Sequence, residues 1–435
     1  MSQAAERPRV EILTFGCRVN QYETQVMRER LARQFELASG DADLYLVSAC
    51  TVTALAEKKA RQAIRRLRRE HPDAKVVLVG CLADAVAQGL TRVSDADLLG
   101  GNAWKGRVNE LVSRALDGER GFAAAAEPVP LSEERAERDP SRARAFLKVQ
   151  DGCDLRCTFC RTNQVRGPSR SKPIPAAVEE ARRLVASGCP EIVVSGINLA
   201  AYRTEVGGLP DLVREFLRIE GLRRLRLGSI NASGVGEGLI AAFADDRRAC
   251  PHFHMPLQSG DDDVLRLMAR GYTASSYVET VARVRRAIPD ASFGADVIVG
   301  FPGEDDAAFG RTCSIVEEVG FANLHVFRYS PRKGTPATSF PRSVPEEVKR
   351  ERASRLEELA AKVEERVRQA FVGSEETVLV EEWKANRWRG YTRQYLDVHF
   401  AAAGAVGPGI EVPVKLAGTN EGHLEGVTDH RTGMR

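Results

Sequence analysis

The sequence predicts an α/β protein with three parts: an N-terminal doubly wound parallel α/β domain, a central partial (β/α)6 barrel of the TIM type and a small C-terminal β-barrel. Short apolar segments alternate with helical patterns in two series along the chain. A small, charged, proline-containing stretch at residues 118–143 separates the two series. Short alternating strands follow Gly373. A length of 435 residues suits about three such domains.

In the first series, apolar segments lie at residues 9–17, 43–50 and 75–81, with helical patterns at 20–35 and 54–70 between them. This alternation is typical of a parallel sheet that has helices on both faces. No G-x-G-x-x-G fingerprint follows any of the three strands.

The second series contains six strand candidates, which suggests an incomplete TIM-type barrel with active groups at the carboxyl ends of its strands. A long charged helix follows at 345–372, with Pro345 at its start and Gly373 just past its end. The predicted boundaries are 8–118 for the first domain, 119–141 for the linker, 142–370 for the barrel and 371–435 for the last domain. The six candidates are 144–150, 190–195, 223–228, 252–257, 292–299 and 322–329.

Composition excludes some classes of protein. Apolar residues make up 43% of the chain and charged residues 28%, without an apolar run long enough to span a bilayer. The start, MSQAAERPR, lacks the apolar stretch of a signal peptide, so we expect a cytoplasmic protein without a membrane partner. The nine cysteines are an odd number, which excludes a fully paired disulfide framework and favours metal binding or catalysis.

Three cysteines form a compact motif directly after the first strand of the second series. Cys153, Cys157 and Cys160 follow a C-x3-C-x2-C spacing, short enough for three thiolates to hold one iron–sulfur cluster. A zinc knuckle is the alternative, but no fourth Cys or His follows at finger spacing. Three thiolates leave one iron of a four-iron cluster open for a small molecule.

Three other cysteines, Cys17, Cys50 and Cys81, each end a predicted strand of the first series. The carboxyl ends of neighbouring parallel strands lie side by side, so these thiols can meet at one point. A second three-ligand cluster is therefore one interpretation, and three isolated core cysteines are the other. The last three, which share no spacing, are interpreted as ordinary core or helix-end residues: Cys189, Cys250 and Cys313.

Several motifs together resemble the methylthiotransferases of the radical S-adenosylmethionine (SAM) superfamily. They are TFGCRVNQYET, SACTVT, VGCLA, CDLRCTFC, RGPSRS, SGIN, HMPLQSG and DVIVGFPGE. The resemblance runs from about residue 8 to the C-terminus. It implies two 4Fe-4S clusters, an auxiliary one on Cys17, Cys50 and Cys81 and one that binds and cleaves SAM on Cys153, Cys157 and Cys160.

Three branches of this family act on different substrates: threonylcarbamoyladenosine in tRNA, isopentenyladenosine in tRNA, and an aspartate of a ribosomal protein. GCRVNQYET at 16–24, SACTVT and NLHVFRYSPRKGTPA at 323–337 are similar to the first branch. That branch implies a methylthio group inserted at carbon 2 of N6-threonylcarbamoyladenosine at position 37. The other two substrates, and an RNA-binding iron–sulfur protein without radical chemistry, stay open as alternatives.

The resemblance also implies a SAM pocket at the ends of the barrel strands. The candidate SAM-binding residues are Ser195, Gly196, Asn198, Ser229 and Gln258.

Two histidines, His252 and His254, share one face of a strand. We interpret them, like His325, as part of a polar barrel interior in preference to a metal site.

The sequence departs from the family pattern directly after Cys160. The family generally has an apolar Ile-Ile-Pro there, whereas this chain has Arg161, Thr162, Asn163 and Gln164. We interpret the departure as variation in cofactor contacts or substrate fit and not as a loss of activity.

The last domain resembles a TRAM domain, a small RNA-binding barrel. Its segment EEWKANRWRGYTRQY mixes aromatic and basic residues, which suit unpaired bases and phosphates even though the net charge is only +3. The expected partners are the anticodon loop of tRNA, an electron donor such as flavodoxin or ferredoxin, and a sulfur source. The candidate RNA-binding residues are Lys384, Arg387, Arg389, Tyr391 and Arg393.

Overall fold

The computed structural model describes residues 7–51, 53–124, 126–402 and 406–428. The chain divides into two compact units. Unit 1 comprises Met1–Glu137, Phe146–Glu180 and Arg332–Thr338, and unit 2 comprises Arg138–Ala145, Ala181–Pro331 and Ser339–Arg435. The division into domains at 8–118, 142–370 and 371–435 stays a prediction.

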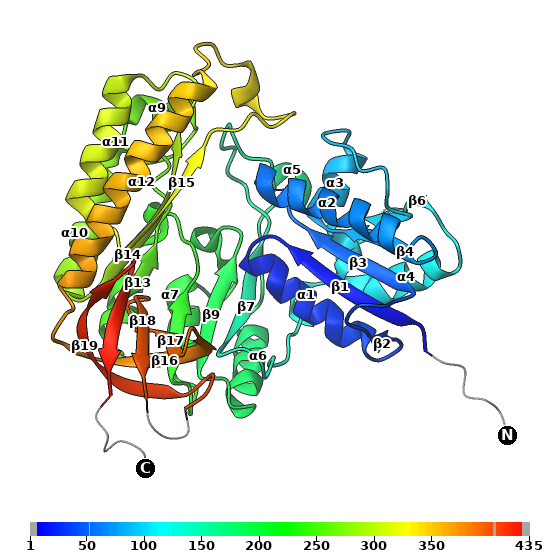
Figure 1. Cartoon of the computed structure of the whole chain (residues 1–435), viewed down its shortest axis with the longest axis horizontal. Helices are drawn as coiled ribbons and strands as arrows, with labels where there is room; N and C mark the ends of the chain where they lie inside the picture. Colours follow the sequence, from blue (N-terminus) through cyan, green and yellow to red (C-terminus); the bar gives the residue numbers. More distant parts are fainter. Residues whose placement is uncertain (1–6, 52, 125, 403–405, 429–435) are drawn as a thin grey trace. The chain divides into compact units, whose positions relative to one another are not determined.

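Unit 1 contains a six-stranded sheet in which every strand pair is parallel (Figure 1). The order is β2-β1-β3-β4-β5-β6, so the three strands that precede the N-terminal cysteines are neighbours. The strands are β1 (Arg9–Phe15), β2 (Glu36–Leu37), β3 (Leu44–Ala49), β4 (Lys75–Val79), β5 (Leu98–Gly100) and β6 (Gly121–Phe122).

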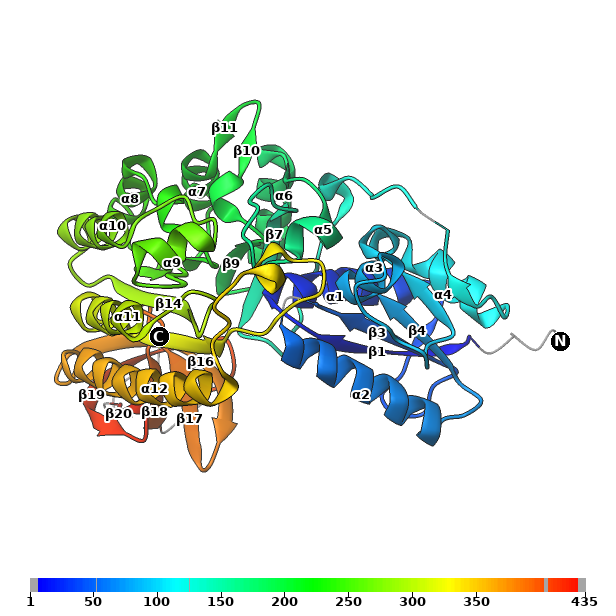
Figure 2. The ribbon, with the colours of Figure 1, turned by 90° about the horizontal axis from the view of Figure 1, so that it is seen from above.

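Helices cover both faces of this sheet (Figure 2). Leu44 and Leu46 of β3 pack in one hydrophobic cluster with α1 (Arg18–Leu31) and α4 (Val108–Leu116). The alternate residues Tyr45 and Val47 pack in a second cluster with α2 (Ala54–Glu70) and α3 (Cys81–Ala87). Apolar side chains on both faces of β3 explain why its sequence, LYLVSA, is almost continuously apolar.

Unit 1 also includes the segment that carries the second cysteine triplet. It follows β7 (Arg144–Asp151) and is succeeded by α5 (Thr162–Arg166), β8 (Arg170–Ser171) and α6 (Ile174–Ala186). β8 returns antiparallel to β7, pairing Asp151 with Arg170, so the cysteine loop is closed at its base.

The short 3-10 helices of the described residues, in both units, are η1 (Asn102–Arg107), η2 (Leu131–Glu133), η3 (Leu199–Ala201), η4 (Ala232–Gly234) and η5 (Pro336–Ser339).

Unit 2 contains parallel strand pairs β9–β12 and β13–β14–β15, linked by the parallel bridges Leu225–Ala249 and Ser229–His254. A small antiparallel pair, β10 (Arg203–Thr204) with β11 (Gly207–Gly208), lies outside them. The parallel strands are β9 (Glu191–Gly196), β12 (Arg224–Leu227), β13 (His252–His254), β14 (Ser292–Val299) and β15 (Asn323–Arg328). The helices are α7 (Leu209–Leu217), α8 (Glu237–Ala244), α9 (Asp262–Leu267), α10 (Ala274–Ala287), α11 (Asp306–Val319) and α12 (Glu346–Gln369).

The C-terminal strands close into a five-stranded barrel in the order β16-β17-β18-β20-β19. Its core is aliphatic and aromatic, with Val378, Val398 and Phe400 fully buried. The strands are β16 (Glu375–Lys384), β17 (Arg387–Tyr391), β18 (Asp397–Ala401), β19 (Glu411–Asn420) and β20 (His423–Val427).

A buried ionic cluster holds this barrel against the starts of β9 and β12. Glu191 is fully buried and accepts hydrogen bonds from the guanidinium of Arg226 at 2.8 and 3.2 Å. Arg226 also donates to the carbonyl of Arg393, and Arg224 donates to the carbonyl of Thr377, both in the barrel. Burial raises the pKa of Glu191, but the arginines outweigh it and lower the value to about 2.

The parallel sheets and the closed C-terminal barrel confirm the expected α/β class. The finer description, a doubly wound domain followed by a partial TIM-type barrel, stays a prediction. Among the described residues, no helix combines the length and apolar composition that crossing a membrane requires.

Candidate functional site

The thiols of Cys17, Cys50 and Cys81 meet at the carboxyl ends of β1, β3 and β4. Cys50 lies within hydrogen-bonding reach of both other thiols. Cys17 is the N-cap of α1 and Cys81 is the first residue of α3, so each thiol stands where a strand ends and a helix begins. The sequence pattern therefore identified three residues that the fold brings together, although they are far apart along the chain.

The electrostatics of this triplet favour thiolates. Hydrogen bonding with Cys50 and the positive charge of Arg166 lower the pKa of Cys17 to about 6 and that of Cys81 to about 5. The pKa of Cys50 is raised, because it donates to both neighbours and is buried between them. Thiolates are the form that binds metal, so the triplet is chemically suited to a cluster.

The surroundings of the triplet also fit a cluster. The backbone at Gly16 passes so close to Cys50 that a Cβ would lie 2.6 Å from the Cys50 Cβ, and its φ of +156° disfavours other residues. Asn20 is fully buried, and its amide Nδ2 has no partner among the described residues. A cavity of about 500 Å3 opens beside Cys17 and Cys50. An unpaired buried donor beside thiols is the group that an iron–sulfur cluster accepts from.

The second triplet lies in the loop between β7 and α5. The thiols of Cys157 and Cys160 are near enough to Cys153 to raise its pKa, after the larger effect of burial. The N–H of Thr162 donates to the Cys160 sulfur at 3.3 Å. Gly152, with φ of +71°, starts the loop, and a Cβ there would lie 1.9 Å from the Pro168 carbonyl oxygen. The loop is therefore preformed by its backbone, and its three thiols suit one cluster.

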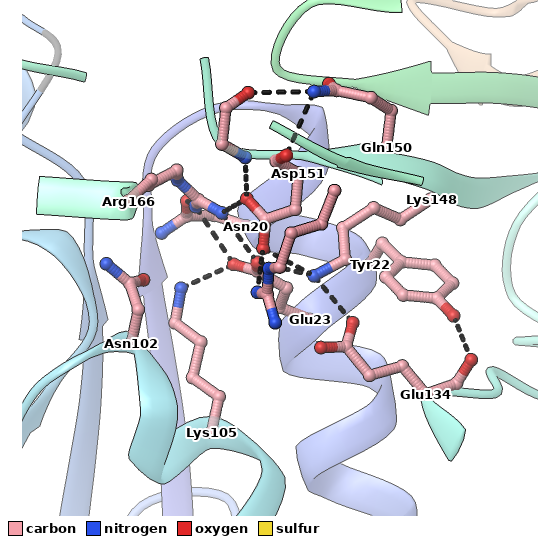
Figure 3. Close-up of polar contacts among 12 residues, drawn as sticks. Asn20, Tyr22, Glu23, Asn102, Lys105, Glu134, Lys148, Gln150, Asp151 and Arg166 are labelled. Carbon is pink, nitrogen blue, oxygen red and sulfur yellow. Dashed lines mark hydrogen bonds and ion pairs between the residues drawn. The ribbon is translucent and has the colours of Figure 1, made fainter. Parts of the chain in front are cut away.

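A buried charge network lies between the elements that carry the two triplets (Figure 3). Its centre is Glu23 of α1, which pairs with Lys105, with Lys148 at 3.0 Å and with Arg166 at 2.8 Å. Asp151 pairs with Arg166 at 2.8 Å and with Lys148 at 3.3 Å. Burial raises the pKa of Glu23, but these three cations outweigh it and hold the value well below the usual range.

This network is continuous with the first triplet. Arg166 donates to the Asn20 side-chain oxygen at 3.1 Å, and the Cys17 thiol approaches the same oxygen at 3.8 Å. Asn102 lies 3.5 Å from the Cys81 sulfur. The motif NQYE contains Asn20 and Glu23 one turn apart on α1, which was the available signal, but their partners could not be identified from the sequence.

The residues that depart from the family pattern anchor a distant segment. Arg161 donates from Nε to the carbonyl of Lys333 at 2.9 Å, and Gln164 donates to the carbonyl of Gly334 at 2.7 Å. In the same part of unit 1, the carboxylate of Glu57 receives Arg332 at 2.6 Å. Arg161 and Gln164 thus both contact the segment 332–338, all within unit 1, and the departure from the family pattern stays a prediction.

In unit 2, the candidate SAM-binding residues follow the carboxyl ends of their strands. Ser195 and Gly196 end β9, and Asn198 follows them, accepting a hydrogen bond from Asn231 at 3.2 Å. Ser229 is exposed just after β12. Carboxyl ends of parallel strands are where such folds bind ligands, so the placement agrees with the expectation without testing it.

Gln258 has the most unusual backbone of this group. Its φ is +66°, a conformation that costs free energy for a non-glycine residue, and its side-chain Oε1 is buried without a partner among the described residues. Its backbone is held from both sides, because its N–H donates to Asp296 and its carbonyl accepts from Ile298. A strained backbone and an unpaired acceptor together mark Gln258 as a ligand-contacting candidate.

Two histidines share one carboxylate on the strands beside it. His254 lies 3.3 Å and His325 lies 3.0 Å from different oxygens of Asp296. Gly294 makes room for this group, since a Cβ there would lie 2.8 Å from His254 Nδ1. The three ligand atoms lie within 4.8 Å of one another, as a metal site requires. Both carboxylate oxygens face the imidazoles, and we interpret the cluster as polar lining of the strands.

The candidate RNA-binding residues have different environments. Lys384 is exposed at the end of β16, beside Trp383, whose ring is 55% exposed and meets Trp388 edge to face. Arg387 pairs with Glu425, and Arg389 pairs with Asp397 at 2.8 Å and with Glu382. Tyr391 stacks on Tyr395, and Arg393 donates to the carbonyl of Ala249. The RNA-binding role of the five residues stays a prediction, with Lys384 and Trp383 the most accessible part of the segment.

Two family models match the chain, and curated relatives match most of its length. The family model of the Radical SAM superfamily matches residues 147–315, and that of the uncharacterized protein family UPF0004 matches residues 9–101. The chain is 39% identical to the threonylcarbamoyladenosine tRNA methylthiotransferase MtaB of Thermotoga maritima over 90% of this chain and 91% of that protein. It is 34% identical to the protein of the same name from Rickettsia prowazekii over 96% of this chain and 97% of that protein.

A solved structure shows the likeness in fold. The radical SAM methyltransferase TsrM from Kitasatospora setae, with cobalamin and a [4Fe-4S] cluster bound, has a TM-score of 0.57 at 16% identity over 76% of this chain and 74% of that chain. At this identity the likeness concerns the fold alone.

The Radical SAM family model and these relatives therefore identify an iron–sulfur enzyme of the radical SAM superfamily, which uses SAM and [4Fe-4S] chemistry. More particularly, the chain belongs to the radical SAM tRNA methylthiotransferase family.

Proposed function

We propose that the protein inserts a methylthio group at carbon 2 of N6-threonylcarbamoyladenosine at position 37 of tRNA, by a radical SAM mechanism with two 4Fe-4S clusters. The observation that carries this proposal is the identity of 39% to a relative named for that activity, over nine-tenths of both chains, together with two cysteine triplets in one compact unit. The acceptors of the other two branches, isopentenyladenosine and a ribosomal-protein aspartate, are the alternatives.

Each triplet has its own role in this proposal. Cys17, Cys50 and Cys81 hold the auxiliary cluster, and the second triplet holds the cluster that binds SAM. With SAM bound, the second cluster supplies the electron that cleaves SAM and so activates an unreactive C–H bond. The chain's own groups favour the thiolate forms of Cys17 and Cys81: Asn20, Asn102 and the Arg166 guanidinium lie around the sulfurs.

The remaining partners follow from the same proposal. Ser195, Gly196, Asn198, Ser229 and Gln258 contact SAM, and the exposed Trp383 and Lys384 contact the anticodon loop, with Arg387, Arg389, Tyr391 and Arg393 shaping that surface. Stacking on an exposed tryptophan beside a cation suits unpaired bases. The reaction needs an electron donor such as flavodoxin or ferredoxin and a sulfur source, and we place it in the cytoplasm.

The substrate is tested by mass spectrometry of tRNA nucleosides from a strain that lacks the gene. We expect methylthio-threonylcarbamoyladenosine to disappear and threonylcarbamoyladenosine to accumulate, and the wild-type gene on a plasmid should restore the product. Loss of the methylthio form of isopentenyladenosine, with the other product unchanged, would transfer the proposal to that substrate. Loss of neither would leave the ribosomal-protein branch.

A Cys50→Ala variant separates the two clusters. Cys50 lies between Cys17 and Cys81, so its loss removes the central ligand of the first triplet and leaves the second intact. We expect 5′-deoxyadenosine formation from SAM to continue at a measurable rate, while methylthiolated tRNA falls at least about a hundred-fold. Both products are quantified by liquid chromatography. Methylthiolation at the wild-type level would contradict the auxiliary role of the first triplet.

A further inference from the structure

One carboxylate in unit 1 is surrounded by three arginines. Glu57 of α2 pairs with Arg61, with Arg332 at 2.6 Å and with Arg161 at 3.8 Å. The side chains of Glu57, Arg161 and Arg332 are 4%, 5% and 10% exposed, whereas that of Arg61 is 36% exposed. We call these four residues the Glu57 site. Among the residues that the structure describes, Glu57 is the one carboxylate that forms an ion pair with Arg61, Arg161 or Arg332.

The Glu57 site therefore carries three positive charges and one negative charge, a net charge of +2. Uncompensated charge is costly inside a protein, since burial removes hydration. The imbalance is also visible in hydrogen bonding, because the buried Nε atoms of Arg61 and Arg332 have no partner among the described residues. Since no second carboxylate among the described residues pairs with these guanidinium groups, the site keeps an excess of positive charge.

The position of the site indicates what balances it. Arg332 donates to the carbonyl of Thr51 at 2.5 Å, and Thr51 follows Cys50 directly. Arg161 follows Cys160 directly. Arg332 interacts electrostatically with the thiols of both Cys50 and Cys160. Arg332 thus contacts the residue that follows one cysteine of the first triplet, and Arg161 is the residue that follows one cysteine of the second, all within unit 1.

We propose that the Glu57 site is the counter-charge of the two clusters and raises their reduction potentials, an inference that rests on the proposed function. An oxidised four-iron cluster on three thiolates has a net charge of about −1, and reduction makes it more negative. Positive charge nearby stabilises the reduced form more than the oxidised form, so it makes reduction easier.

Arg161 is the part of the site that directly follows a cysteine of the second triplet. Its guanidinium adds one positive charge beside Cys160 and is fixed by its bond to the Lys333 carbonyl. The departure from the family pattern is therefore a change in cluster electrostatics, and Arg161 is a positioning residue that acts through the clusters.

The test compares reduction potentials in the reconstituted full-length protein, followed by electron paramagnetic resonance during an anaerobic potentiometric titration. At the potential where half of the wild-type cluster held by the second triplet is reduced, Arg161→Ile should decrease the ratio of reduced to oxidised cluster about ten-fold, which is about 59 mV for a one-electron couple. Arg161→Lys and Arg332→Lys keep the charge and should stay near the wild type.

The matched control is Arg65→Gln, which removes an arginine of α2, the helix that carries Glu57 and Arg61; Arg65 is 69% exposed, and its partner Asp95 is 3.7 Å away. It should leave the potential unchanged. An Arg161→Ile protein with full iron content and the wild-type potential would overturn the proposal, and so would an equal shift in Arg65→Gln. The potentiometric titration is carried out without tRNA, so its result does not depend on the identity of the substrate. A wild-type enzyme that leaves threonylcarbamoyladenosine unmodified would therefore remove the proposed substrate without changing the comparison of potentials.

Discussion

Replacing Cys157 with alanine is expected to abolish SAM cleavage, lowering 5′-deoxyadenosine formation by at least about a thousand-fold. Cys157 is the central and most buried residue of the second triplet. In the wild type, three thiolates bind three irons of the cluster and leave a single iron open for SAM. Alanine provides no ligand for iron, so the variant keeps only two thiolates. The measurement is 5′-deoxyadenosine formed from SAM and dithionite under anaerobic conditions, beside the iron content of the protein.

A cysteine outside both triplets provides the control. Cys313 of α11 is half-buried, and alanine there should leave both iron content and SAM cleavage at the wild-type level. Undiminished cleavage in the Cys157 variant would remove the second triplet from the radical chemistry. Equal loss in both variants would indicate a general effect of cysteine removal on folding.

Replacing Glu23 with glutamine is expected to lower the free energy of unfolding by about 3–5 kcal/mol, because it leaves buried cations without their shared anion. Lys105, Lys148 and Arg166 all pair with Glu23, whose side chain is 3% exposed. The measurement is urea unfolding followed by circular dichroism. Glu110→Gln is the control, since Glu110 is half-exposed and pairs with Arg114 at 3.6 Å, and it should cost less than about 0.5 kcal/mol.

The cost in the Glu23 variant should depend on pH in a defined direction. The folded-state pKa of Glu23 lies well below the ordinary 4.5, so its ionised form stabilises the fold above about pH 4.5. This contribution is lost as the pH falls through the folded-state value. The difference between wild type and variant should therefore be largest at neutral pH and shrink below pH 4.5. A constant difference would show that the cost comes from packing and not from charge.

Much of the cysteine site was predictable because the topology of the sheet determines where these residues lie. Cys17, Cys50 and Cys81 each end a strand, and a parallel sheet brings strand ends together whatever the details of the side chains. The second triplet is local in sequence, so its spacing alone predicted a shared ligand. The same reasoning placed Ser195 and Ser229 at strand ends in unit 2.

The charge network could not be predicted, because its partners are brought together by folding alone. Glu23 and Lys148 are 125 residues apart, and Glu23 and Arg166 are 143 apart. A lysine or glutamate in a helical pattern is usually solvated, so nothing in the sequence marked these as buried. Similarly, the sequence predicted that Arg389 binds RNA. In the structure its guanidinium donates a hydrogen bond to the carboxylate of Asp397, eight residues later.

The grouping of both triplets within unit 1 limits which parts of this chain can be exchanged during evolution. Glu23 belongs to the part of the chain before the linker, and Lys148, Asp151 and Arg166 belong to the part after it. Neither part can be exchanged for an unrelated one without leaving unpaired charges in its interior. Residues of the N-terminal sheet region and residues 146–180 are therefore expected to evolve together, since the charges of the one are paired by the charges of the other.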